Sequence, residues 1–456
     1  MVPLLGCWFP DYFNDRISRK PPCDLHSRGE TSPPHLKRIL RAFFMSFVPA
    51  ESRAWPAEGV TRVPYWVYQD AEVYGREQER IFRGETWTFL GLEAEVPQSG
   101  DFKTTFMGDM PVVLARDENG ELRAFENRCA HRGALLCLKG SGNTRELACV
   151  YHNWTYDLQG NLTAVAFRKG IQGKGGMPRD ARPENHAPRK LRVAGYHGLV
   201  FGTLSDAAPS IEDYLGPEIA ARARRVMKEP VTLLGGYSQM LPNNWKLYMD
   251  NVKDTYHASL LHLFFTTFRL NRLEQKGGVI VGGDGGNHVS YTMMKTDALA
   301  TEYEKAGVRS ARHGYRLEAP ELLESVDEIG DGITLQILAV FPGFVLQQIM
   351  NSLAVRQVIP KGVNRTELVW TCFGYASDDP VMRERRLRQA NLIGPAGYIS
   401  MEDGAATGFV QRGVAGAPEH SALVEMGGRA VASDESRVNE TSVRGLWQAY
   451  RRHMGL

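Results

Sequence analysis

The pattern of hydrophobic and polar positions changes character along the chain. Between residues 86 and 205, short apolar runs alternate with glycine-containing turns, and the turn at 117–120 reads Asp-Glu-Asn-Gly. Short alternating runs bounded by turn residues are typical of β-strands. The strands expected here cover residues 102–107, 112–116, 122–125 and 191–204. The pattern therefore predicts a compact all-β domain over residues 86–205.

The rest of the chain mixes two periods. Residues 70–83 and 245–268 have helical spacing, and helices are also expected at 211–215, 381–392, 398–410 and 442–454. Strand-like runs occupy 279–281, 288–294, 334–341, 344–349, 354–359 and 367–375. Together these elements predict an α+β fold. The all-β domain is inserted near the start of a larger domain, formed by residues 51–85 and 206–456, with a central antiparallel sheet covered by helices.

Composition excludes several classes of protein. The 456 residues carry a formal charge of only +2, which argues against a nucleic-acid or anionic membrane surface. No apolar run approaches the roughly 20 residues that span a bilayer. Six cysteines are too few for a disulfide scaffold, so a metal or redox role in a reducing cytoplasm is expected. Residues 1–50, rich in Pro, Arg and Ser, are expected to be a disordered or non-native extension without a signal peptide.

Two short motifs combine cysteine with histidine. Cys129-x-His131 is followed, after seventeen residues, by Cys149-x-x-His152. Two thiolates and two imidazoles suit a [2Fe-2S] cluster in which the cysteines hold one iron and the histidines the other. A tetrahedral zinc site is the main alternative. Because each motif holds one cysteine and one histidine, unlike the knuckles of a zinc finger, the spacing favours a Rieske-type cluster. No further cysteine adjoins either motif, which favours the lower-potential kind found in oxygenases and ferredoxins.

A second set of candidate metal ligands follows the pattern D-x-x-H-x4-H, formed by Asp254, His257 and His262. Residues five apart lie about 140° apart around an α-helix, so a bend or a π-bulge is expected to bring the two rings together. Two histidines and a carboxylate form the facial triad that binds non-haem Fe(II). The carboxylate is expected to be Asp403, with Glu402 as the alternative. Taken alone, two histidines at this spacing are more often ordinary core or surface residues.

The two sets together resemble the large subunits of the Rieske non-haem iron aromatic-ring oxygenases. The similarity extends over about residues 55–456, with matching stretches at 125–135, 244–265, 275–281, 392–413 and 441–455. The resemblance implies a head-to-tail trimer, with a smaller β subunit (α3β3) and a separate NAD(P)H-dependent reductase. It also implies that Asp254 links the iron site to His131 or His152 of a neighbouring subunit. No GxGxxG fingerprint for a dinucleotide is present.

Within this family the chain is similar to subunits that act on aromatic carboxylates, and terephthalate is the expected substrate. A salicylate- or anthranilate-type ring hydroxylase, acting on a monocarboxylate, is the alternative. Arginine binds carboxylates in a bidentate manner, so Arg356 and Arg437 are the expected anchors, with Ser290 assisting and Arg412 as a further option. The apolar part of the pocket is expected to include Leu261, Ile337 and Phe341.

Overall fold

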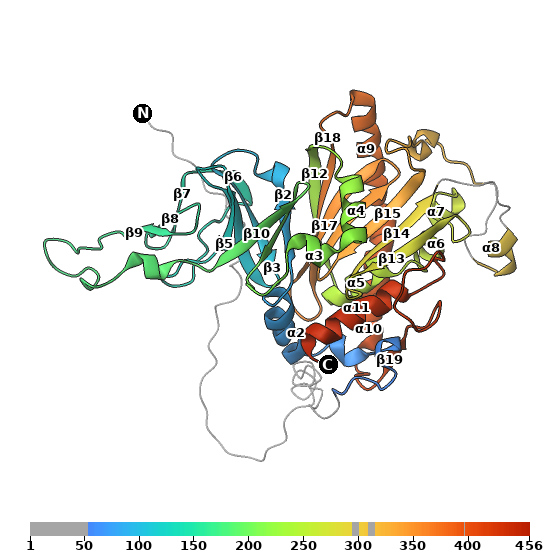
Figure 1. The fold of residues 1–456 in the computed structure, drawn as a ribbon, viewed down its shortest axis with the longest axis horizontal. Coiled ribbons are helices and arrows are strands. Elements are labelled where there is room, and N and C mark those ends of the chain that lie inside the picture. The colour runs from blue at the N-terminus through green and yellow to red at the C-terminus, as the bar shows by residue number, and fades with distance from the viewer. Residues whose placement is uncertain (1–52, 294–300, 309–314, 396) are drawn as a thin grey trace, which may run out of the picture. The chain divides into compact units, whose positions relative to one another are not determined.

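The computed structural model describes residues 53–293, 301–308, 315–395 and 397–456 (Figure 1). The expectation for residues 1–50, and the last residue of the strand predicted at 288–294, lie outside the described residues. Within the described part, no helix has the length and apolar character needed to cross a membrane.

The predicted all-β region forms two antiparallel sheets. The larger has the strand order β2-β11-β10-β5-β4-β3-β6, and the smaller has the order β7-β8-β9. Their strands are β2 (Thr88–Leu92), β3 (Asp101–Met107), β4 (Met110–Arg116), β5 (Leu122–Glu126), β6 (Ser141–Asn143), β7 (Glu146–Ala148), β8 (Thr155–Asp157), β9 (Leu162–Ala164), β10 (Lys190–Tyr196) and β11 (Leu199–Thr203). The run predicted at 191–204 is a hairpin of two strands, because His197 and Gly198 both have positive φ and reverse the chain.

A third antiparallel sheet forms the centre of the larger region, in the order β12-β18-β17-β16-β15-β14-β13. Its strands are β12 (Val231–Leu241), β13 (Gly277–Gly282), β14 (Asn287–Met293), β15 (Ile333–Val340), β16 (Phe344–Ile349), β17 (Ser352–Pro360) and β18 (Thr366–Tyr375). Strand β12 was not predicted from the sequence. It is a largely exposed edge strand whose pairing is interrupted by a bulge at Leu233–Gly235, so it lacks a clean alternation.

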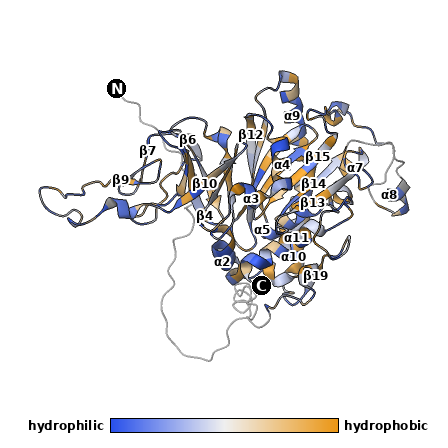
Figure 2. Cartoon of the chain, viewed as in Figure 1, coloured by the Kyte–Doolittle hydropathy of each residue, from blue (hydrophilic) through white to orange (hydrophobic). Residues whose placement is uncertain are grey.

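Helices cover both faces of this third sheet. The helices of the described residues are α2 (Ala71–Glu77), α3 (Ile211–Leu215), α4 (Pro217–Val226), α5 (Trp245–Lys253), α6 (Ala258–Leu261), α7 (Leu263–Thr267), α8 (Thr301–Lys305), α9 (Pro380–Ile393), α10 (Tyr398–Val414) and α11 (Thr441–Met454). One face packs against α5 and the opposite face against α3 and α4. Strands β16 and β17 are consequently buried along their whole length. In Figure 2 the strands are coloured mainly as hydrophobic, whereas α2 and α9 carry hydrophilic stretches.

A buried ion pair joins three of these helices. The carboxylate of Glu77 lies 2.6 Å from Nζ of Lys246 and accepts hydrogen bonds from Trp245 and Tyr450. A buried charge is costly unless it is paired and hydrogen-bonded. This cluster therefore fixes α2, α5 and α11 relative to one another. The α+β fold predicted from the sequence is confirmed.

Candidate active site

The two cysteine–histidine motifs fold into loops with the same hydrogen-bond pattern. The amide of Cys129 donates to the carbonyl of Ala134 (2.7 Å), and the amide of Cys149 donates to the carbonyl of Trp154 (2.8 Å). In both loops the residue four positions after the cysteine has a positive φ, 77° for a glycine and 53° for an asparagine. Each loop therefore closes within six residues and presents its own cysteine and histidine.

The loops bring the four side chains of the motifs together. Cys129 and Cys149 are buried and free of disulfide bonds. The rings of His131 and His152 lie 4.5 Å apart, and His131 stacks on Trp154 at 4.7 Å. Burial of the thiols beneath a pair of partly exposed imidazoles gives a site with a sulfur side and a nitrogen side.

The pairing of one cysteine with one histidine in each loop favours a two-iron cluster over zinc. A tetrahedral zinc ion would gather its ligand atoms around one point. Among the described residues, one other set of side chains has its ligand atoms within 4.8 Å of one another, and no three of these four do. Moreover, Nδ1 of His131 is buried without a partner among the described residues. Two thiolates and two imidazoles fit the two irons of a [2Fe-2S] cluster.

A break in the helix brings the second pair of histidines together. Helix α5 ends at Lys253, and His262 stands between α6 and α7 with φ −82° and ψ 84°. The rings of His257 and His262 lie 5.4 Å apart as a result. The sequence predicted one helix over 245–268 with a bend or a π-bulge; the structure has three helices, and the bend is a full interruption.

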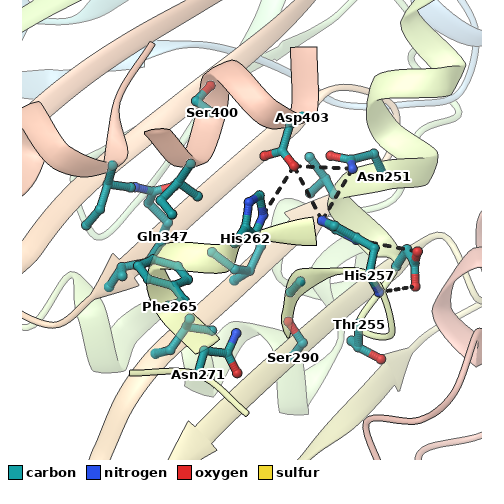
Figure 3. A pocket seen from close by; sticks show the side chains of 18 of the residues that line it. Asn251, Thr255, His257, His262, Phe265, Asn271, Ser290, Gln347, Ser400 and Asp403 are labelled. Atoms are coloured by element: carbon teal, nitrogen blue, oxygen red, sulfur yellow. Dashed lines mark hydrogen bonds and ion pairs between the residues drawn. The ribbon is translucent and has the colours of Figure 1, made fainter. Parts of the chain in front are cut away.

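Asp403, on α10, lies between these two rings (Figure 3). Its Oδ1 is 3.4 Å from Nε2 of His257 and 3.3 Å from Nε2 of His262. The three ligand atoms lie within 4.8 Å of one another, so the group could hold one metal ion. Burial opposes ionisation of Asp403, but the two histidines outweigh it and hold the pKa of the carboxyl well below its usual range. Asn251 donates to the same Oδ1 at 3.4 Å.

Each histidine also faces a second carboxylate through its other ring nitrogen. Nδ1 of His257 lies 3.4 Å from Oδ2 of Asp254, and Nδ1 of His262 lies 2.8 Å from Oε2 of Glu402. Burial disfavours the charged imidazole of His257, yet Asp254 and Asp403 together raise its pKa to about 10. Carboxylates behind ligating histidines fix the tautomer and the orientation of the ring. Glu402 therefore does not occupy the place of Asp403 in this geometry.

A cavity adjoins this group. Its volume is about 70 Å³. Most of its apolar lining comes from α7, α9, α10, β15 and β16, and includes Phe265, Leu335, Ile337, Ile349, Ile393 and Ile399. Its polar lining includes Asn271, Ser290, Gln347, Arg356, Trp370 and Arg437.

Arg356 enters the cavity from β17. Its side chain is buried, Nη1 donates to the hydroxyl of Tyr248 at 2.9 Å, and the guanidinium lies 4.8 Å from the centre of the Trp370 ring. Its Nε is buried without a hydrogen-bond partner among the described residues. No carboxylate of the described chain pairs with Arg356, which leaves a buried cation facing the cavity.

Arg437 enters from the loop before α11. Nη1 donates to the side chain of Asn271 and Nη2 to the carbonyl of Arg272, while Nε has no partner among the described residues. Burial lowers the pKa of Arg437 to about 10, which leaves it charged at neutral pH. Its Nε lies beside Gly277 of β13, where a Cβ added to the glycine would be 3.1 Å away. The strand beside Arg437, β13, and the strand that carries Arg356, β17, are four strand positions apart, roughly 19 Å, so the two arginines enter from separate parts of the fold.

Other residues predicted for the pocket are placed differently. Ile337 and Ser290 line the cavity, whereas Leu261, Phe341 and Arg412 are not among the described residues that line it. Phe341 stacks on His453, and Arg412 lies over Phe409 on α10. Sequence reasoning missed Asn251, Asn271, Gln347 and Trp370. Only Asn251 had a sequence signal, since it lies three residues before Asp254, which directly follows the helix α5.

A Rieske-type cluster site and a facial triad within one chain define a Rieske non-haem iron oxygenase. Residues 86–172 match the family model of the Rieske [2Fe-2S] domain, and residues 218–456 match that of the ring hydroxylating alpha subunit (catalytic domain). The chain belongs to the ring-hydroxylating oxygenase alpha subunits. Its cofactors are a Rieske [2Fe-2S] cluster and a mononuclear iron.

Individual relatives agree with this assignment. The chain is 59% identical, over 88% of its length and 97% of the relative, to the terephthalate 1,2-dioxygenase terminal oxygenase component subunit alpha 2 of a Comamonas species. It is 46% identical, over 88% of its length and 95% of the relative, to the anthranilate 1,2-dioxygenase large subunit of Burkholderia cepacia. The structure of naphthalene 1,2-dioxygenase from Rhodococcus shares the fold, with a TM-score of 0.71 at 24% identity over 86% of this chain and 94% of that one.

Proposed function

We propose that this protein is the oxygenase component of a multicomponent enzyme that adds both atoms of O₂ to terephthalate as a cis-diol. The observation that carries the proposal is the pair of buried guanidinium groups, Arg356 and Arg437, that face one cavity without a carboxylate partner among the described residues. Burying an unpaired charge is costly. A ligand with two carboxylates would supply both partners, and the relative at 59% identity bears the name of a terephthalate dioxygenase.

The roles proposed for the metal-binding residues follow the geometry. Cys129, His131, Cys149 and His152 would hold the cluster, and His257, His262 and Asp403 would hold the mononuclear iron. When bound, the cluster supplies single electrons and the iron activates O₂. The protein's own contribution is to exclude water with an apolar wall and to fix the aromatic ring beside the triad.

The carboxylate anchors define the position of the ring. Arg356 would bind one carboxylate, and Arg437, with Ser290 as an additional donor, would bind the other. The ring would then lie against the apolar residues of β15 and β16, where a para-dicarboxylate has little freedom to rotate. Asn251, hydrogen-bonded to Asp403 and near Nε2 of His257, would keep the triad in place.

We infer that Asp254 has a second role at a subunit boundary. Its side chain is about one fifth exposed and accepts from the amides of Tyr256 and His257, which hold it beside the triad. In a head-to-tail trimer it would hydrogen-bond to His131 or His152 of a neighbouring subunit. The proposal also includes a small β subunit in an α3β3 assembly, a separate NAD(P)H reductase and a cytoplasmic location. It further places the boundary between the two domains at residues 205–206.

The test is oxygen uptake by the oxygenase co-expressed with a β subunit and supplied with a reductase and NAD(P)H. The panel comprises terephthalate, phthalate, isophthalate, benzoate, salicylate and anthranilate. Uptake coupled to a cis-diol product with terephthalate alone is expected. Preference for a monocarboxylate would overturn the assignment of the substrate.

A monocarboxylate ring hydroxylase is the second candidate. It is favoured by the 46% identity to an anthranilate 1,2-dioxygenase subunit. Such an enzyme needs only one anchor, so replacing Arg356 or Arg437 would have very unequal effects. The diacid proposal requires both replacements to weaken substrate binding severely.

A further inference from the structure

Gln347 is a buried amide in the floor of the cavity with neither polar atom satisfied. Its side chain is 1% exposed, and both Nε2 and Oε1 lack a hydrogen-bond partner among the described residues. Buried side-chain amides in folded proteins are nearly always hydrogen-bonded. Two unsatisfied polar atoms in a core lower the stability of the free protein. Their presence at Gln347 indicates that the bound ligand supplies a hydrogen-bond partner.

The sheet register shows why no neighbour satisfies this amide. On β16, Gln347 pairs with Ile337 of β15 and with Ala354 of β17. Neither side chain offers a donor or an acceptor. Val345 and Ile349, the next residues of β16 on the same face, are apolar as well. Gln347 is therefore a single amide in an otherwise apolar part of the floor.

The adjacent residue on the strand, Gln348, is a buried glutamine whose polar atoms are hydrogen-bonded within the protein. Gln348 faces the opposite side of the sheet and is also buried. Its Nε2 donates to the carbonyls of Ile333 and Met350, and its Oε1 accepts from Arg225 at 2.6 Å. The two glutamines differ in two respects: Gln347 alone faces the cavity, and Gln347 alone lacks hydrogen-bond partners among the described residues.

The position of Gln347 next to Arg356 identifies the chemistry of its partner. Arg356 pairs with Val345, two residues along β16 on the same face, so the amide is a diagonal neighbour of the guanidinium. Arg356 uses Nη1 for Tyr248 and leaves Nε free. A guanidinium has five N–H donors and a carboxylate about four acceptor sites, so a carboxylate bound by Arg356 can also accept a hydrogen bond from the neighbouring amide.

We propose that Gln347 is a specificity-determining residue whose Nε2 donates to the same substrate carboxylate as Arg356. The inference rests on the proposed function and deepens it. Because a carboxylate accepts hydrogen bonds, it would face the NH₂ end of the amide. This donor is neutral, so Arg356 and Arg437 remain the two cations that match the two negative charges of a diacid. The site thereby selects a second carboxylate over a hydrogen at that ring position.

Two substitutions test this inference in the assembled, metal-loaded oxygenase. Gln347→Met keeps the length of the side chain and removes both polar atoms, and Gln347→Glu places an anion beside Arg356. The measurements are the Kd for terephthalate and for benzoate, by calorimetry, and the midpoint of thermal unfolding. Gln348→Met is the matched control, since it removes satisfied hydrogen bonds on the same strand away from the cavity.

Substitutions at Gln347 and Gln348 are expected to separate the effect on terephthalate binding from the effect on stability. Gln347→Met weakens terephthalate binding by about 10-fold or more, with an unfolding midpoint equal to or above that of the wild type. Gln347→Glu weakens terephthalate binding further and changes benzoate binding much less, so preference shifts toward the monoacid. Gln348→Met lowers the unfolding midpoint and leaves the Kd unchanged.

An unchanged Kd for terephthalate in Gln347→Met would overturn the inference, and so would equal losses for terephthalate and benzoate in Gln347→Glu. Wild-type protein that does not bind terephthalate would instead overturn the proposed function, and this inference with it. The wild-type titration therefore separates the two failures.

Discussion

Nδ1 of His262 lies 2.8 Å from Oε2 of Glu402, while Nε2 of the same ring lies 3.3 Å from Oδ1 of Asp403. Two consecutive residues of α10 thus contact opposite nitrogens of one imidazole. His257 repeats the arrangement, with Asp254 behind it and Asp403 in front. Both histidines are held between a rear carboxylate and the shared carboxylate of the triad. This relationship gives Glu402 and Asp403 different roles, which can be tested separately.

Replacing Glu402 with Gln should weaken the binding of iron without abolishing it. The amide oxygen of glutamine is a weaker acceptor than a carboxylate for the N–H at Nδ1 of His262. Loss of a strong acceptor behind a ligating histidine reduces metal affinity by about 10-fold or more. Iron retained per subunit after dialysis against a chelator measures the effect. The exposed Glu419→Gln is the control. Asp403→Ala should lose the mononuclear iron altogether while the visible spectrum of the cluster persists, and equal losses in both variants would contradict the distinction.

Asp254→Asn should slow turnover by more than any accompanying loss of mononuclear iron explains, while the cluster remains filled. The asparagine Oδ1 can still accept from the amide of Tyr256, so the local turn is preserved. Loss of the carboxylate behind His257 should reduce product formation by roughly 10- to 100-fold. Single-turnover oxidation of a pre-reduced cluster, with iron content measured in parallel, checks this. A normal rate of cluster oxidation would exclude Asp254 from the link between subunits.

Arg356→Ala and Arg437→Ala should each raise the KM for terephthalate by roughly 10- to 100-fold, because each removes charge-assisted hydrogen bonds to a carboxylate. Steady-state oxygen uptake measures the change. Arg412→Ala should behave like the wild type, since Arg412 lies over Phe409 away from the cavity. A large effect in only one of the two cavity variants would support the monocarboxylate alternative.

Asp250 should make the metal-free protein less stable as the pH rises. Burial raises the pKa of Asp250 to about 7, and the nearby Asp254 and Glu440 contribute, against a hydrogen bond from Trp447. A carboxyl with a raised pKa in the folded state favours folding at pH 4, and this contribution is lost as the pH rises through 7. Asp250→Asn mimics the neutral form. Its unfolding midpoint should match that of the wild type near pH 4 and exceed it at pH 8; the reverse order at pH 8 would contradict the prediction.

The chain's local patterns predicted much of the fold. Strands β15 to β18 were found where alternating or continuous apolar runs predicted them, because strands buried on one or both faces must carry apolar side chains at fixed positions. The cysteine–histidine loops were also evident in the sequence, since each closes within six residues. Strand β12 was not predicted, because an exposed edge strand with a bulge does not require an apolar pattern.

The sequence by itself determined which ligand types the chain carries and how they are grouped: two cysteine–histidine pairs, then two histidines with a carboxylate near. Only the tertiary structure decided which neighbouring residue does what. Glu402 and Asp403 differ by one position on a helix, and Gln347 and Gln348 by one position on a strand, yet each pair faces different surroundings. The partners that distinguish them lie on other elements of the fold, in some cases more than a hundred residues away, so no local pattern could reveal them.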